Sequence, residues 1–182
     1  MTMNDNQQDK AYLHNEEEAV KMAIEKEIAV QKFYRENAEK MKMPLAKKAF
    51  EFLASQEKKH EEAIKKFNSD VLKGNNPDVS IRTMNTEKMK EFLGQNLENV
   101  REKFTASKDE IRIYELAKDR ELTAYNFYKQ SASEATHENV RHLFTFLTHE
   151  EDGHYHLLAN MISYFSNPEG YFQDQEDWFF EG

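Results

Sequence analysis

Residues 50–60 read FEFLASQEKKH, and residues 144–154 read FTFLTHEEDGH. In both segments the apolar residues are spaced three or four positions apart, which is typical of one face of an α-helix. Each segment ends in a Glu-x-x-His pair that continues this face. The two segments therefore predict two helices whose inward faces carry a carboxylate and an imidazole.

Both segments belong to a longer internal repeat, in which matching residues stand 94 positions apart without a gap. The matched pairs are Ala23 and Ala117, Glu27 and Glu121, Phe33 and Phe127, Tyr34 and Tyr128, Phe50 and Phe144, Leu53 and Leu147, Glu57 and Glu151, and His60 and His154. Coincidence at one shared offset is a poor explanation. We interpret the chain as two similar helical hairpins.

The apolar periodicity predicts four helices, over residues 15–42, 44–67, 108–135 and 137–166. Pro44 suits a first helical turn, Ser107 and Glu110 match a capping box, and Thr136 is predicted to cap the fourth helix. The joints within each hairpin are short, so the paired helices should be antiparallel. The predicted fold class is therefore all-α, a four-helix bundle of two hairpins joined by one long crossover.

Outside the helices, three segments have a different character. Residues 1–14 are polar, and we expect them to be disordered or extended. The crossover, residues 70–107, is expected to contain a further helix over residues 86–104. Residues 167–182 are an aromatic tail, which we expect to cover either the bundle or a partner chain, and the sequence does not decide between these roles. The domain itself is expected to span residues 15–166.

Composition narrows the function classes. The net charge of −9 without a basic stripe argues against a nucleic-acid partner. The chain has no cysteine, which excludes disulfides and thiolate-bound metal sites within it. No apolar run approaches the roughly 18 residues of a membrane span, and no signal peptide is recognisable. We expect a cytoplasmic protein without a membrane partner.

Polar residues interrupt the predicted inward faces at six positions: Glu27, Glu57, His60, Glu121, Glu151 and His154. Buried carboxylates that face one another are costly unless a cation neutralises them. Two divalent cations balance four carboxylates, so the pattern predicts a dinuclear metal site. Glu57 and Glu151 are predicted to bridge both ions, and Glu27 and Glu121 to be terminal ligands. Oxygen and imidazole ligands suit iron, which we expect, or manganese.

Tyr34 and Tyr128 follow the terminal Glu residues by two helical turns. Their hydroxyls are predicted either to pack in the core or to donate a hydrogen bond to a ligand carboxylate across the bundle. The pair Glu134 and His137 also has Glu-x-x-His spacing but no counterpart 94 positions earlier, so we interpret it as surface or capping. The remaining histidines are expected at the surface: His14, His142, His149 and His156.

These motifs resemble the di-iron domain of rubrerythrins, within the ferritin-like superfamily, over residues 15–166. The resemblance implies reduction of hydrogen peroxide at a dinuclear iron centre. Rubrerythrins usually also carry a rubredoxin-like domain with four cysteines, which is absent here, so the resemblance implies a separate electron donor. They also tend to have one more Glu on the third helix, where this chain has Lys118 and Ala124. A six-ligand site also resembles simpler ferritin-like ferroxidase centres.

The leading hypothesis is therefore an oxidoreductase that reduces hydrogen peroxide or O₂ with electrons from a separate donor. The alternatives are an iron-binding or storage protein with ferroxidase activity, a di-manganese catalase-like enzyme, and a bundle in which metal serves stability alone. A homodimer or small homo-oligomer is expected, and the long crossover permits exchange of hairpins between chains.

Overall fold

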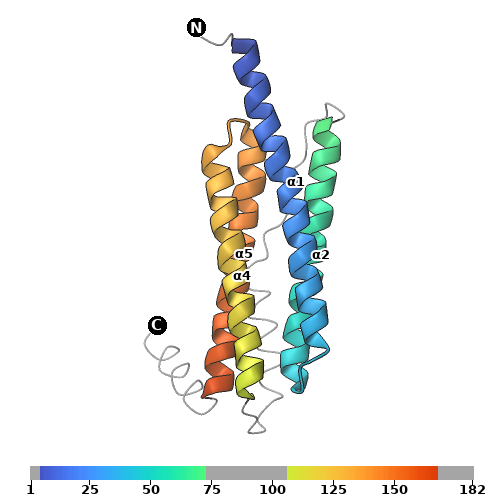
Figure 1. Cartoon of the computed structure of the whole chain (residues 1–182), viewed down its shortest axis with the longest axis vertical. Helices are drawn as coiled ribbons and strands as arrows, with labels where there is room; N and C mark the ends of the chain where they lie inside the picture. Colours follow the sequence, from blue (N-terminus) through green and yellow to red (C-terminus); the bar gives the residue numbers. More distant parts are fainter. Residues whose placement is uncertain (1–4, 73–105, 168–182) are drawn as a thin grey trace, which may run out of the picture.

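The structure is a computed structural model that describes residues 5–72 and 106–167, with side chains described for residues 15–71 and 106–167. Its four long helices are α1 (Asp5–Ala38), α2 (Pro44–Leu72), α4 (Lys108–Glu134) and α5 (Glu138–Ser166). They pack as two hairpins, α1 with α2 and α4 with α5, lying side by side (Figure 1). The predicted all-α four-helix bundle is confirmed. The crossover helix and the aromatic tail lie outside the described residues.

The first helix differs from its predicted bounds at both ends. It begins at Asp5, whereas residues 1–14 were expected to be extended or disordered. Residues 5–14 contain neither Gly nor Pro, so nothing in them stops the helix from extending toward the N-terminus. It ends at Ala38 rather than Lys42, because the next backbone N–H groups bond three residues back in a tighter turn.

The start of α4 follows its prediction. Ser107 Oγ accepts a hydrogen bond from the backbone N–H of Glu110 at 3.3 Å, and Glu110 Oε2 accepts one from the N–H of Ser107 at 3.1 Å. This is the predicted capping box. Glu110 Oε1 also accepts a hydrogen bond from the N–H of Lys42 at 2.9 Å. One carboxylate thus joins the α1–α2 turn to the other hairpin.

The start of α5 corrects the prediction that Thr136 is its cap. The N-cap is His137, and its side chain makes no capping hydrogen bond. Glu16 of α1 binds the turn before α5, since its Oε1 accepts from the N–H groups of Thr136 at 2.5 Å and His137 at 3.1 Å. The Thr136 hydroxyl also donates to Glu16, at 2.8 Å. A charged acceptor from another helix therefore fixes the α4–α5 turn.

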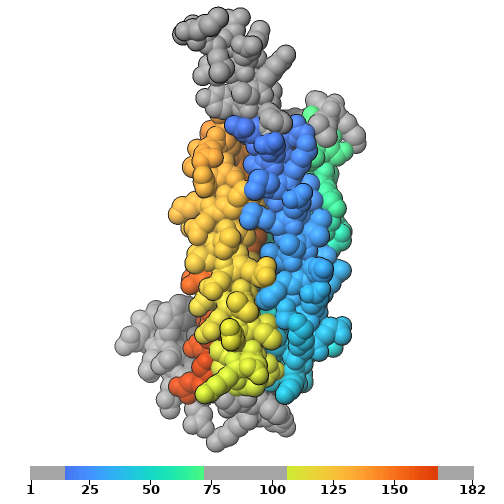
Figure 2. All heavy atoms as spheres, in the orientation of Figure 1, coloured from blue at the N-terminus to red at the C-terminus, as the bar shows by residue number. Residues whose placement is uncertain are grey.

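Glu16 and Glu110 are themselves 94 positions apart, as are the Lys42 and Thr136 backbones that they bind. A second pair of crosswise contacts joins α1 to α4. Lys26 lies over the ring of Phe127, and Arg120 lies over the ring of Phe33, at 4.8 and 4.4 Å from the ring centroids. Figure 2 shows the face on which α1 and α4 meet. The repeat thus extends from the inward faces to the contacts between hairpins.

The core consists of two apolar clusters separated by a polar layer. One cluster includes Phe50, Tyr114 and Phe165, and the other includes Ile64 and Phe144. Along every helix the residues of one cluster precede the polar position and those of the other follow it. The polar layer is therefore closed at both ends by packed aromatic and aliphatic side chains. None of the described helices is long and apolar enough to cross a membrane.

Candidate metal centre

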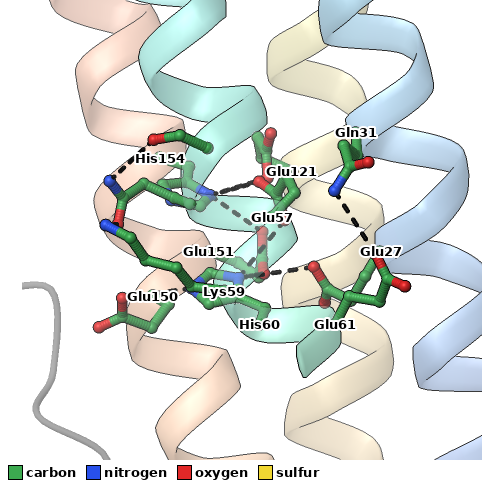
Figure 3. Close-up of polar contacts among 12 residues, drawn as sticks. Glu27, Gln31, Glu57, Lys59, His60, Glu61, Glu121, Glu150, Glu151 and His154 are labelled. Carbon is green, nitrogen blue, oxygen red and sulfur yellow. Dashed lines mark hydrogen bonds and ion pairs between the residues drawn. The ribbon is translucent and has the colours of Figure 1, made fainter. Parts of the chain in front are cut away.

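The structure brings together all six residues predicted to hold metal. They point into one space between the four helices (Figure 3). Each is almost completely excluded from solvent, with exposed fractions of 2% for Glu27, 1% for Glu57, 3% for His60, 0% for Glu121, 1% for Glu151 and 0% for His154. Burial of four carboxylates without paired Lys or Arg indicates a need for another positive charge.

The six residues form two overlapping groups. We name the group of Glu27, Glu57, His60 and Glu151 the His60 half-site. We name the group of Glu57, Glu121, Glu151 and His154 the His154 half-site. In each group, one potential ligand atom per residue lies within 4.8 Å of all the others. Glu57 and Glu151 belong to both groups, as expected of bridging carboxylates, and the arrangement is consistent with a dinuclear metal site.

Both histidines direct Nδ1 toward the carboxylates. His60 Nδ1 lies 3.5 Å from Glu27 Oε2 and 3.4 Å from Glu57 Oε2. His154 Nδ1 lies 2.9 Å from Glu57 Oε1 and 3.6 Å from Glu121 Oε2. The two rings stack with centroids 5.3 Å apart. Each Nδ1 also lies near Glu151, at 3.7 Å for His60 and 3.5 Å for His154, so each imidazole faces one terminal and both shared carboxylates.

The site fits cations better than it fits a network of hydrogen bonds. Among the described residues, seven fully buried side-chain polar atoms have no hydrogen-bond partner, and all of them belong to these six residues. They are Glu27 Oε2, Glu57 Oε1, His60 Nδ1, Glu121 Oε2, Glu151 Oε1, His154 Nδ1 and His154 Nε2. Buried polar atoms are normally satisfied. All but the last lie in the shared polar layer, where a cation would bind them.

Burial and mutual repulsion control the charges of the carboxylates. Burial, followed by the charge of Glu57, raises the pKa of Glu27 to about 8. Burial also raises the pKa of Glu151 well above its usual range, and Glu57 adds to the effect. Burial acts on Glu57 in the same direction, but the charge of His154 and hydrogen bonds within the cluster hold its pKa well below the ordinary value.

For the two histidines, burial and the neighbouring charges change the pKa in opposite directions. Burial lowers the pKa of both imidazoles, but surrounding carboxylates outweigh it and raise the pKa well above the ordinary value. Glu150 and Glu27 do this for His60, and Glu57 and Glu121 do it for His154. Without metal the cluster thus holds protons on groups that must lose them to become ligands.

Tyr34 and Tyr128 are fully buried and contact the terminal carboxylates across the bundle. The Tyr34 hydroxyl donates to Glu121 Oε1, and the Tyr128 hydroxyl donates to Glu27 Oε1. Of the two predicted alternatives, the hydrogen bond is therefore present, in addition to core packing. In both carboxylates the second oxygen, Oε2, remains directed at the cluster.

Sequence reasoning missed two buried carboxylates beside the site. Oε2 of Glu150 lies 3.3 Å from Nε2 of His60. Glu61 accepts a hydrogen bond from the side-chain amide of Gln31 at 3.5 Å. Glu61 also pairs with Lys65 at 2.5 Å, which lowers its pKa. Both residues adjoin a predicted ligand in sequence, where helical periodicity places just one of two neighbours on the inward face.

The other predictions about polar residues concern the surface. His142, His149 and His156 are exposed, as expected, and the His14 side chain lies outside the described residues. His137 is exposed and contacts Glu16, in agreement with a surface or capping role. The two positions three residues from Glu121, Lys118 and Ala124, offer no carboxylate to the cluster.

Comparison with known proteins supports the same interpretation. The rubrerythrin family model matches residues 18–162. The solved structure of a hypothetical protein from Pyrococcus furiosus is similar, with 25% sequence identity and a TM-score of 0.59. The match covers 82% of this chain and 89% of that one. Comparison with curated proteins gives no match.

Proposed function

The chain belongs to the rubrerythrin family, and from this premise we propose that it is a non-haem di-iron oxidoreductase that reduces hydrogen peroxide or O₂. The observation that carries the proposal is the pair of four-residue groups that share Glu57 and Glu151. Such shared carboxylates are the arrangement of di-iron and di-manganese bundle proteins. Iron is the proposed metal and manganese the alternative, because carboxylate and imidazole donors suit both.

The protein and its metal have separate tasks in this proposal. When bound, two ferrous ions would supply the two electrons that, with two protons, convert hydrogen peroxide to water. Tyr34 and Tyr128 each fix one oxygen of a terminal carboxylate and leave the other oxygen available at the cluster. The apolar clusters on both sides close the polar layer and so limit side reactions at the centre.

The electrons that restore the reduced centre are proposed to come from a separate donor. No residue among these 182 is cysteine, so no thiolate-bound iron within them can relay electrons. We propose that the donor is a reduced protein or small reductant that acts on a homodimer or small homo-oligomer of this chain.

The decisive experiment is anaerobic loading of the metal-free protein with two Fe²⁺ per chain, followed by rapid mixing with hydrogen peroxide or O₂. The absorption of the oxidised iron in the near ultraviolet gives the rate. We expect much faster oxidation by peroxide. Glu121→Ala is the variant to compare, since it removes a ligand of the His154 half-site only. If that variant retains two irons and full turnover with peroxide, the proposed site is wrong.

A second candidate function is iron oxidation for binding or storage. The observation in its favour is Ala124, which leaves the third helix with Glu121 as its contribution to the cluster. This function predicts faster oxidation by O₂ and continued iron uptake beyond two per chain. Native mass measurement separates the candidates further, because storage requires a shell of many subunits and a small oligomer argues against it.

A further inference from the structure

His60 has a charged partner on the side of its ring that faces away from the cluster. Its Nε2 lies 3.3 Å from Oε2 of Glu150, which belongs to α5, whereas His60 belongs to α2. Glu150 is 3% exposed and is therefore a buried carboxylate in its own right. The Nδ1 of the same ring faces Glu27 and Glu57. One imidazole thus connects Glu150 to the proposed metal ligands (Figure 3).

His154 lacks such a partner. The residue 94 positions before Glu150 is Gln56, which is also buried, at 6% exposure. Its amide nitrogen donates to Ser55 Oγ at 3.5 Å, and its amide oxygen accepts from Lys59 Nζ at 3.4 Å. Within the described part of the chain, His154 Nε2 has no hydrogen-bond partner. The repeat is therefore broken at the position that contacts the outer nitrogen of the imidazole, and this difference distinguishes the two half-sites.

This difference has a direct consequence for metal binding. A carboxylate that accepts the outer N–H of a ligating imidazole fixes its tautomer and makes the inner nitrogen a better donor. Loss of such a partner typically lowers metal affinity about 10- to 100-fold. Glu150 also adds a buried negative charge close to the His60 half-site, whereas Gln56 adds none near His154.

We propose that Glu150 is a positioning residue that makes the His60 half-site bind its metal ion before the His154 half-site. The inference rests on the proposed dinuclear centre and adds an order of loading to it. At one metal ion per chain, the predominant species has the His60 half-site filled and the His154 half-site empty.

The test is an anaerobic calorimetric titration of the metal-free chain with Fe²⁺. The wild type should bind two ions in two separate steps. Glu150→Gln, which keeps the shape and removes the charge, should weaken the tighter step about 10- to 100-fold and leave the other unchanged. Gln56→Glu is the matched variant on the other half-site and should strengthen the weaker step. Circular dichroism of the metal-free variants establishes that they fold.

Two ligand variants assign the steps. Glu27→Ala should abolish the tighter step and Glu121→Ala the weaker one, because each removes a residue found in one half-site alone. Mössbauer spectra with one equivalent of ⁵⁷Fe²⁺ supply a readout that folding alone does not change. The wild type should give one ferrous doublet, and Glu150→Gln two.

The outcomes separate this inference from the proposed function. Uptake of fewer than two ions by the wild type contradicts both. Two ions bound in a single step, or two steps that neither Glu150→Gln nor Gln56→Glu alters, contradict the order of loading but leave the dinuclear centre standing. If Glu150→Gln does not fold, Gln56→Glu provides the test. The inference is then wrong if Gln56→Glu leaves the affinity of the weaker binding step unchanged.

Discussion

The hydroxyl of Tyr128 on α4 donates a hydrogen bond to the carboxylate of Glu27 on α1, in the other hairpin. Tyr34 and Glu121 make the same contact in the reverse direction. Each hairpin therefore orients the terminal carboxylate of its partner. The geometry of the proposed metal centre depends on both hairpins at once, and several measurements can detect this dependence.

Tyr128→Phe should lower the affinity of the His60 half-site for Fe²⁺ about 10- to 100-fold, because Glu27 loses the donor that orients it. Tyr114→Phe is the matched control. Tyr114 is equally buried, but its hydroxyl donates to the Ala46 carbonyl at 3.2 Å, away from the cluster. Both variants should lose about 1 kcal/mol of stability, and calorimetric titration should reveal weaker metal binding for Tyr128→Phe alone. Equal affinities for the two variants would contradict the orienting role.

The metal-free protein should become less stable as pH rises from about 6.5 to 8. The pKa of Glu27 is raised to about 8 and that of Glu151 well above its ordinary value, chiefly by burial. The stabilising contribution of both groups is therefore complete below about 4.5 and is lost as pH rises through the folded values. His60 and His154 also have raised pKa values, so their contribution is complete below 6.5 and declines above it. Denaturant unfolding in the presence of chelator measures this trend.

Glu27→Gln is the control for that trend. Because an amide does not ionise, the metal-free variant should lose less stability than the wild type between these pH values. A wild-type unfolding free energy that increases over the same range would show that the carboxylates are not protonated in the metal-free cluster.

Metal uptake should release protons and become tighter as pH rises toward 8. The groups with raised pKa values hold protons in the metal-free state, and a cation must displace them from carboxylates and imidazoles. Titration with Fe²⁺ in buffers of different ionisation enthalpy counts the released protons. Binding that is independent of pH and releases no protons would exclude these residues as the ligands.

Glu110→Ala and Glu16→Ala should each destabilise the bundle by about 1–2 kcal/mol, since each removes a charged acceptor of backbone N–H groups in the opposite hairpin. Glu36→Ala is the control, because its ion pair with Lys32 is 3.7 Å long and exposed, and should change stability by less than about 0.5 kcal/mol. Thermal or denaturant unfolding of the metal-free proteins compares the three.

The contribution of Glu16 and Glu110 to stability should be lost in acid. Burial acts to raise the pKa of Glu16 and of Glu110, but backbone hydrogen bonds from the opposite turn outweigh it and hold both values below the ordinary one. Their contribution is complete above about 4.5 and is lost as pH falls through the lower folded values. The difference in unfolding free energy between the wild type and Glu110→Ala should therefore become smaller in acid. A difference that does not change with pH would contradict the proposed contribution of the ionised Glu110 carboxylate.

The sequence predicted the inward faces well because a buried Glu or His interrupts an apolar stripe and is visible at helical spacing. The repeat then located all six residues of the cluster and the two tyrosines. The contacts of Glu16 and Glu110 could not be recognised in this way, because neither residue interrupts an apolar stripe. Glu16 lies within α1 and Glu110 in the first turn of α4, where acidic residues are ordinary, and only the packing brings them to the opposite turn.

Glu150 was hidden for a related reason. It stands beside Glu151 in a polar stretch, and helical periodicity assigns just one of two neighbours to an inward face. The close approach of α5 to α2 buries it against His60. The helix bounds at Asp5 and Ala38 depended on local propensity and turn geometry, which determine the ends of a helix less sharply than its middle.

The crosswise contacts have a further consequence for self-assembly. Glu16 with Glu110, Lys26 with Arg120, and Tyr34 with Tyr128 each contact the opposite hairpin through the repeat-related partner. Each hairpin thus presents an approximately self-complementary surface, which is the condition for an isologous dimer. A polypeptide with a single hairpin is expected to pair with its own copy and form a twofold-symmetric metal site. In such a dimer the two half-sites would be identical, because the difference between Gln56 and Glu150 would no longer exist.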